Sequence, residues 1–178
     1  MYSEDSNDIL LTCQDGVPGK RVNWITGGLD FSGARSNWDI NQDVAKSPMW
    51  QYSGKNAQLY KCPADHSMVT VGGVKYPRVR SMSMSQAFSF GEWLDKSQNQ
   101  SQKKWRVYNK LSNITQPSKT FVFIEEHPDS INDAAFANAC TGNQPSDPQS
   151  AAQIIDMPAS FHNGACGMSF ADGHADIH

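Results

Sequence analysis

The sequence predicts an α+β fold with an antiparallel β-sheet, and three segments carry this expectation. Residues 120–124 contain four consecutive large apolar side chains, which is typical of a central strand buried on both faces. Residues 168–178 alternate in polarity around Asp172-Gly173, as the two strands of a hairpin with a two-residue turn do. Residues 1–12 begin with a helical pattern. At 178 residues, we expect residues 1–178 to form one domain.

A further strand is predicted over residues 79–85, because its side chains alternate with a period of two. This alternation puts Arg80 on the apolar face together with two methionines. A buried guanidinium without a partner is costly, so Arg80 is expected to neutralise a buried carboxylate. The candidate partners are Glu125, Glu126 and Asp172.

The charge balance argues against two classes of partner. The chain carries 15 Lys and Arg against 18 Asp and Glu, a formal net charge of -3. We therefore expect no nucleic-acid partner and no polybasic membrane-binding patch. No run of eighteen apolar residues occurs, and the N-terminus has no signal-peptide pattern, so no segment of this sequence is expected to span a bilayer.

Several ordered segments carry a resemblance to a known family. His162 stands ten residues before Asp172, which is followed by Gly173 and His174, and this matches an H-x9-DG pattern. The other matching segments are NWITGGLDF (23–31), YKCPAD (60–65, with Cys62, Pro63 and Asp65), RVRSMS (78–83) and EEHPDSIND (125–133). Together they resemble the pseudopilin-like proteins with the prepilin-processing-associated H-x9-DG C-terminal signature.

The resemblance implies a pilin-like head and a structural role. The chain would be the head of a pseudopilin-like subunit of a type II secretion or type IV pilus-like filament, and not an enzyme. Its partners would be other pilin-like subunits and the secretion machinery, at the periplasmic face of the cytoplasmic membrane or outside the cell. Residues 1–12 would be the tail of the family's N-terminal anchor helix, which would provide the only membrane contact, and residues 161–178 the signature hairpin.

Four cysteines, Cys13, Cys62, Cys140 and Cys166, allow two disulfides in an exported chain, with three possible pairings. Our preferred pairing joins Cys140 to Cys166, which would fix the preceding loop to the hairpin. Buried free thiols are the alternative. The cysteines lack the spacing of a structural zinc site.

Polar residues gather after two predicted strands, and we expect them to form one site. The set comprises Glu125, Glu126, His127, Asp129, Asn132, Asp133, His162, Asp172 and His174. Oxygen-rich side chains on a loop suit Ca²⁺, which accepts six to eight oxygens in flexible geometry. The expected calcium ligands are Asp129, Asn132 and Asp133, with Asp172 contributed by the hairpin.

Two other interpretations of this set remain open. In the first, which we favour, His162 and Asp172 form a hydrogen bond across the base of the hairpin and the site is purely structural. In the second, His162, His174 and Glu126 bind a transition metal, with Glu125 as the general base of a metal-dependent hydrolase.

The tryptophans suggest another function class, an exported recognition module that binds carbohydrate or a secreted protein. Its platforms would be Trp24, Trp38, Trp50 and Trp93, provided that they are exposed. The more ordinary interpretation, which we favour for residues 23–31, is that Trp24, Leu29 and Phe31 are core anchors.

Overall fold

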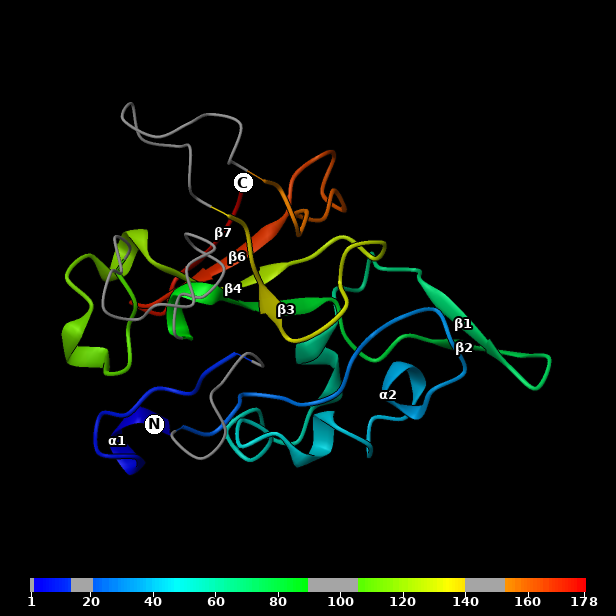
Figure 1. Cartoon of the computed structure of the whole chain (residues 1–178), viewed down its shortest axis with the longest axis horizontal. Coiled ribbons are helices and arrows are strands. Elements are labelled where there is room, and N and C mark those ends of the chain that lie inside the picture. Colours follow the sequence, from blue (N-terminus) through cyan, green and yellow to red (C-terminus); the bar gives the residue numbers. More distant parts are fainter. Residues whose placement is uncertain (1, 14–20, 90–105, 140–152) are drawn as a thin grey trace.

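Two β-sheets organise the part of the protein that the structure describes. A computed structural model describes residues 2–13, 21–89, 106–139 and 153–178. Within these residues, one sheet has five strands in the order β5-β3-β4-β6-β7, and a separate pair joins β1 to β2 (Figure 1). The strands are β1 (Met68–Val71), β2 (Val74–Pro77), β3 (Met82–Ser85), β4 (Phe121–Glu125), β5 (Ala135–Phe136), β6 (Gly167–Phe170) and β7 (Ala175–Ile177).

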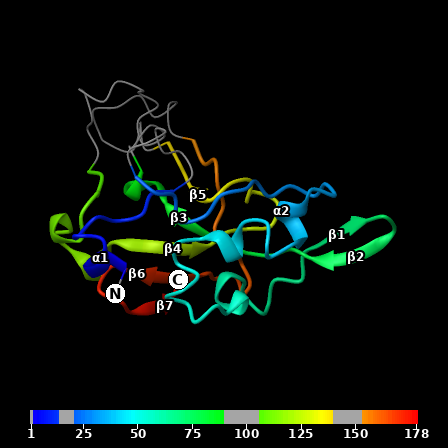
Figure 2. The ribbon, with the colours of Figure 1, turned by 90° about the horizontal axis from the view of Figure 1, so that it is seen from below.

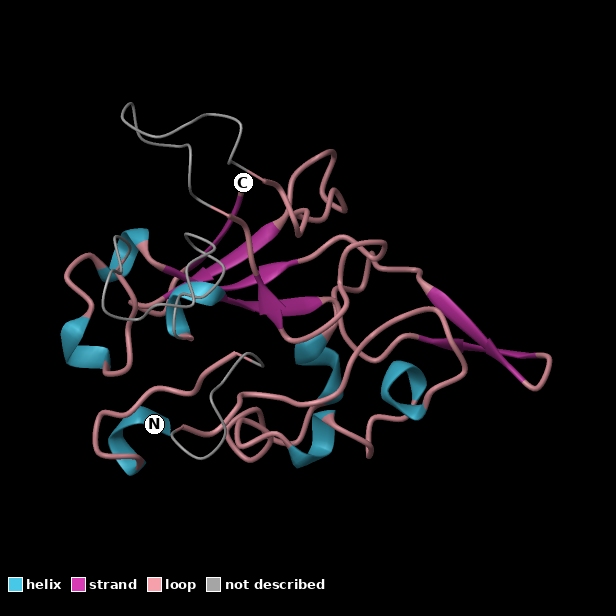
Figure 3. Cartoon of the chain, viewed as in Figure 1, coloured by secondary structure: helices cyan, strands magenta, loops and turns pink. Residues whose placement is uncertain are grey.

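The helices are short, and loops connect most of the elements (Figure 3). The α-helices are α1 (Tyr2–Asp5) and α2 (Arg35–Trp38). Single 3-10 turns are η1 (Val44–Lys46), η2 (Ala57–Tyr60), η3 (Gln86–Phe88), η5 (Leu111–Asn113) and η6 (Pro117–Lys119). The predicted α+β class is confirmed, but the five-stranded sheet is not wholly antiparallel, because β3 and β5 pair in parallel. In the part of the chain that the structure describes, no helix is long and apolar enough to cross a membrane.

Strand β4 is central in the five-stranded sheet, as its apolar run predicts. It pairs antiparallel with β3 on one side and with β6 on the other. The expectation of burial on both faces is wrong for its first half: Phe121, Val122 and Phe123 are only half-buried, whereas Ile124 and Glu125 are buried. The sheet is therefore incompletely covered at the start of β4.

Strand β3 begins at Met82 and not at Val79. The backbone N–H groups of Val79 and Ser81 donate to the carbonyl oxygens of Asn37 and Tyr60, which lie outside the sheet. These bonds keep residues 79–81 out of the β-ladder, which starts where Met82 pairs with Glu125.

The C-terminal hairpin is formed by β6 and β7, with Met168 opposite Asp176. Its loop has three residues and not the expected two, because Phe170 N–H bonds to the His174 carbonyl across residues 171–173. Gly173 has a φ of 95°, the left-handed conformation that ends such a three-residue loop. Figure 2 shows β7 at the edge of the sheet, beyond β6.

The second hairpin, β1–β2, projects from the body of the molecule (Figure 1). Gly72 and Gly73 form its two-residue turn, with φ angles of 56° and 82°. Both values belong to the turn type that matches the twist of a hairpin.

The main core gathers around Trp24, which is 2% exposed. Its ring lies 4.9 Å from that of Phe123, and its Nε1 donates to the Ala134 carbonyl at 2.9 Å. Leu29 is also buried, so two of the three expected anchors of residues 23–31 are in the core. Phe31 is not, because its ring is 52% exposed and lies under the guanidinium of Arg78.

Candidate functional site

Three side chains with different donor atoms meet at the end of β4. His162 Nε2 lies 2.9 Å from Glu125 Oε2 and 3.7 Å from Cys62 Sγ. The three donor atoms all lie within 4.8 Å of one another. We call this group the Cys62–Glu125–His162 cluster; it is the one set of three or more His, Cys, Asp and Glu side chains in the described ranges that is arranged to hold a metal ion.

A tight turn holds Cys62 in place. The Asp65 N–H donates to the Cys62 carbonyl at 3.0 Å, and Pro63 occupies the second position of this turn, where its fixed φ is favourable. The Cys62 N–H donates to the Ser81 hydroxyl at 2.8 Å. Asp65 completes the segment by accepting the Ser67 N–H at 2.8 Å through its carboxylate.

Glu125 and His162 are positioned by the sheet and by a turn that precedes β6. The Gly167 N–H at the start of β6 donates to Glu125 Oε2 at 2.7 Å. His162 pairs with Ala165 through two backbone hydrogen bonds around Asn163-Gly164, and both residues of this turn have positive φ. Cys62 and Glu125 are buried, whereas the His162 side chain is 35% exposed and leaves the cluster open to solvent on one side.

Burial controls the chemistry of the two thiols near Glu125. It raises the pKa of the Cys62 thiol, and a hydrogen bond to the Glu125 carboxylate raises it further. Burial and the Glu125 charge also raise the pKa of Cys166. Both are buried free thiols in the structure. Cys140, the expected partner of Cys166, lies outside the described residues.

The expected hydrogen bond between His162 and Asp172 is not formed. His162 lies before β6, at the open end of the hairpin, whereas Asp172 lies in the loop at its other end. Asp172 Oδ1 instead contacts His174 Nδ1 at 2.5 Å, and the His174 ring stacks on Phe170. A four-residue strand therefore separates the two halves of the H-x9-DG pattern.

Two buried arginines hold the loop that follows β4. Arg78 donates to the carbonyl oxygens of Pro128 and Ile131, at 2.7 and 3.3 Å. Arg80, 2% exposed, donates to those of Met82 and Asp133.

The expected bond from Arg80 to a carboxylate is thus replaced by bonds to backbone oxygens. Burial lowers the pKa of Arg80 to about 10, and the nearby charge of Glu126 partly offsets this effect. A buried role for Arg78 was not predicted from the sequence, although Arg78 stands two residues before Arg80.

The acidic side chains of this loop do not gather as a calcium site would require. The Asp129 side chain is 74% exposed, 3.9 Å from His127 Nδ1. Asn132 is exposed, and Asp133 Oδ1 accepts the Ala135 N–H at 2.7 Å. Asp172 belongs to the distant hairpin loop. The single site that we expected is therefore divided into separate groups.

Glu126 is buried in the protein and does not belong to the Cys62–Glu125–His162 cluster. Its Oε1 accepts the Ser130 hydroxyl at 3.0 Å, and burial raises its pKa to about 8. The transition-metal set of His162, His174 and Glu126 does not converge, because each of these side chains has its own, different partner.

Of the tryptophans expected to form platforms, the three in the described residues are buried or half-buried. Trp24 is in the core, which corrects its role as an exposed platform. Trp38 and Trp50 are half-buried against Tyr76 and Tyr60, with ring centroids 4.9 and 6.1 Å apart. Trp93 lies outside the described residues.

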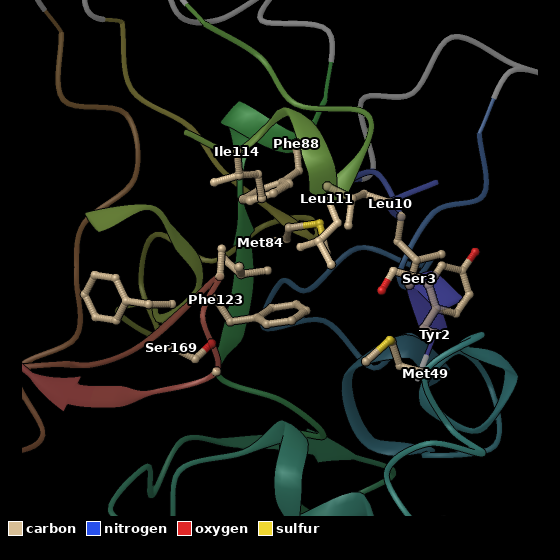
Figure 4. Close-up of a pocket in the computed structure, with 15 residues that line it drawn as sticks. Tyr2, Ser3, Leu10, Met49, Met84, Phe88, Leu111, Ile114, Phe123 and Ser169 are labelled. Atoms are coloured by element: carbon tan, nitrogen blue, oxygen red, sulfur yellow. The ribbon is translucent and has the colours of Figure 1, made fainter. Parts of the chain in front are cut away.

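A groove of about 370 Å³ opens beside the incompletely covered start of β4. Figure 4 shows side chains of Leu10, Met84, Leu111 and Phe123 pointing toward its common space. Further apolar lining comes from Leu11, Met49, Phe88, Ile114, Val122 and Phe170. Tyr2 and Ser3 of α1 form part of its wall. We call this the apolar groove.

Comparison with protein-family models, with curated proteins and with solved structures finds no match for this chain.

Proposed function

We propose that this chain is the head of a structural pseudopilin-like subunit of a type II secretion or type IV pilus-like filament. In this role the head packs against its N-terminal helix and assembles with other subunits, and it does not catalyse a reaction. The H-x9-DG resemblance supplies the family, and the observation that carries the proposal is the apolar groove between α1 and the sheet.

The groove supports this role because it is an apolar surface next to α1, where the N-terminal helix of a pilin-like protein would pack. Pilin-like heads pack their sheet against an N-terminal helix, and here α1 lines the groove with Tyr2 and Ser3. A helix that precedes Tyr2 would cover half-buried side chains such as Val122 and Phe123. Removing this apolar surface from water is favourable.

The proposal also assigns partners and a place. The helix ahead of Tyr2 would contact the membrane and neighbouring pilin-like subunits, and the head would lie at the outer face of the cytoplasmic membrane or outside the cell. The alternative of a carbohydrate-binding or protein-binding module loses one of its four expected platforms, because Trp24 is buried.

The test compares the chain as it stands with the chain carrying a pilin-type helix joined directly ahead of Tyr2. The helix should raise Tm and slow hydrogen exchange at the backbone amides of Met84 and Phe123. Leu111→Asp, in the groove, should abolish this rise, whereas Val74→Asp, at an exposed apolar position of β2 outside the groove, should leave it intact. An unchanged Tm and unchanged exchange on adding the helix would refute the proposal.

A further inference from the structure

The Cys62–Glu125–His162 cluster has a feature that a structural hydrogen-bond network does not require. A sulfur, an oxygen and a nitrogen from three separate segments are directed at one point, and the oxygen and the sulfur both approach the same ring nitrogen, His162 Nε2.

This geometry argues against a catalytic thiol. In a Cys–His–acid triad the nucleophile and the acid bind opposite nitrogens of the imidazole, so that the ring can pass a proton between them. Here both share Nε2. The same convergence is what the ligands of a metal ion show.

We propose that Cys62, Glu125 and His162 bind one Zn²⁺ ion, as a three-ligand site with a fourth position open to water. The proposal does not depend on the pseudopilin role. Ideal Zn–S and Zn–N lengths at a tetrahedral angle put sulfur and nitrogen about 3.6 Å apart. The distance from Cys62 Sγ to His162 Nε2 is 3.7 Å.

The contact between His162 and Glu125 needs only a small adjustment. Tetrahedral geometry separates the nitrogen and oxygen ligands by about 3.3 Å, so the contact of 2.9 Å between His162 and Glu125 must open slightly. The partly exposed His162 side chain leaves a solvent path for the ion and its water ligand.

Neighbouring backbone groups already orient the ligands. The Gly167 N–H holds Glu125 Oε2, and a Cβ at this glycine would come within 3.1 Å of the Glu125 carboxyl carbon. The Cys62 N–H donates to the Ser81 hydroxyl at 2.8 Å and fixes the segment that carries the thiol. Such supporting contacts are typical of metal sites.

The ligand set selects the metal. A thiolate and an imidazole suit Zn²⁺ and related ions, whereas Ca²⁺ takes oxygen ligands only. On binding, the Cys62 thiol releases its proton to solvent, and His162 binds as the neutral imidazole with its proton on Nδ1. The charges of Cys62 and Glu125 then balance that of the ion.

The test uses the whole chain, freed of metal by chelation and then titrated with Zn²⁺. We expect one equivalent to bind and Tm to rise with its concentration, as linkage requires of a ligand specific for the folded state. Co²⁺ in place of zinc should give a sulfur-to-metal charge-transfer band and the strong visible absorption of a tetrahedral site.

Matched variants identify the ligands. Cys62→Ser and His162→Gln should weaken zinc binding by more than about 100-fold, a larger loss than outer contacts cause. Cys166→Ser, a neighbouring buried thiol, and His174→Gln, a histidine of the hairpin loop, should leave it unchanged.

Zinc affinity that survives in Cys62→Ser or His162→Gln would place the ion elsewhere and overturn the proposal. If the Cys62 variant does not fold, the unsubstituted protein decides: folded protein that gives no thiolate–cobalt band refutes the site.

Discussion

Replacing Asp156 by Asn tests whether burial controls ionisation in this protein. Asp156 is only 4% exposed, and its Oδ2 accepts a hydrogen bond from the Ala137 N–H. Burial raises its pKa from 3.8 to about 6, although that hydrogen bond acts in the opposite direction, and the charge of Asp133 raises the pKa further. Asparagine keeps an acceptor for Ala137 and removes the charge.

The magnitude follows from the pKa difference between the two states. A shift from 3.8 to about 6 corresponds to about 3 kcal/mol, at about 1.4 kcal/mol per pKa unit. The folded state holds the proton more tightly, so this stabilisation is complete below pH 3.8 and is lost as pH rises to about 6. Asp156→Asn should therefore raise the free energy of unfolding by up to about 3 kcal/mol at pH 7.5, and by little at pH 3.5.

Urea unfolding of both proteins at several pH values between 3.5 and 8 measures this difference. Glu126 faces the same region, and the Asp156 charge contributes to its raised pKa, so part of the difference should extend toward pH 8. Asp129→Asn, at an exposed carboxylate, is the matched control and should show no comparable trend. An Asp156→Asn protein that is less stable at pH 7.5, or a difference that is independent of pH, would refute the reasoning.

Two further substitutions test the packing of the loops. Arg80→Ala should lower the free energy of unfolding by about 3–5 kcal/mol, because it leaves a cavity and removes the donor to Asp133; a loss below about 1 kcal/mol in denaturant unfolding would contradict this role. Gly27→Ala should cost more than about 2 kcal/mol, because φ is 85° and the new methyl group would collide with the Asp43 carboxylate. Gly33→Ala, whose Cβ would meet Val71 at 3.8 Å, is the control, and an equal Tm loss in both would exclude the collision as the cause.

Local patterns in the sequence predicted the local parts of the fold. The apolar run of residues 121–124 placed β4 at the centre of the sheet, and the alternation after Met168 placed the last hairpin. The β1–β2 hairpin was missed, although Gly72-Gly73 between two valines is a hairpin turn signal.

The candidate site depended on information that no local pattern contains. Glu125 and His162 meet only because β6 pairs with β4 in one particular register. If the pairing of β4 moved by one residue relative to its neighbouring strands, the Glu125 side chain would point to the other face of the sheet. Asp172 was placed beside His162 by their spacing alone, and the length of the hairpin keeps them apart.

The bonds from Arg78 and Arg80 have a consequence for how the loop after β4 can change. Both guanidinium groups bind backbone oxygens, which every amino acid supplies. The path of the chain is thereby made independent of the exposed side chains of Asp129 and Asn132. Substitutions at these exposed positions should therefore change the chemistry of the surface and leave the backbone of residues 127–133 in place. The two buried arginines would in this way let the loop accept different surface side chains.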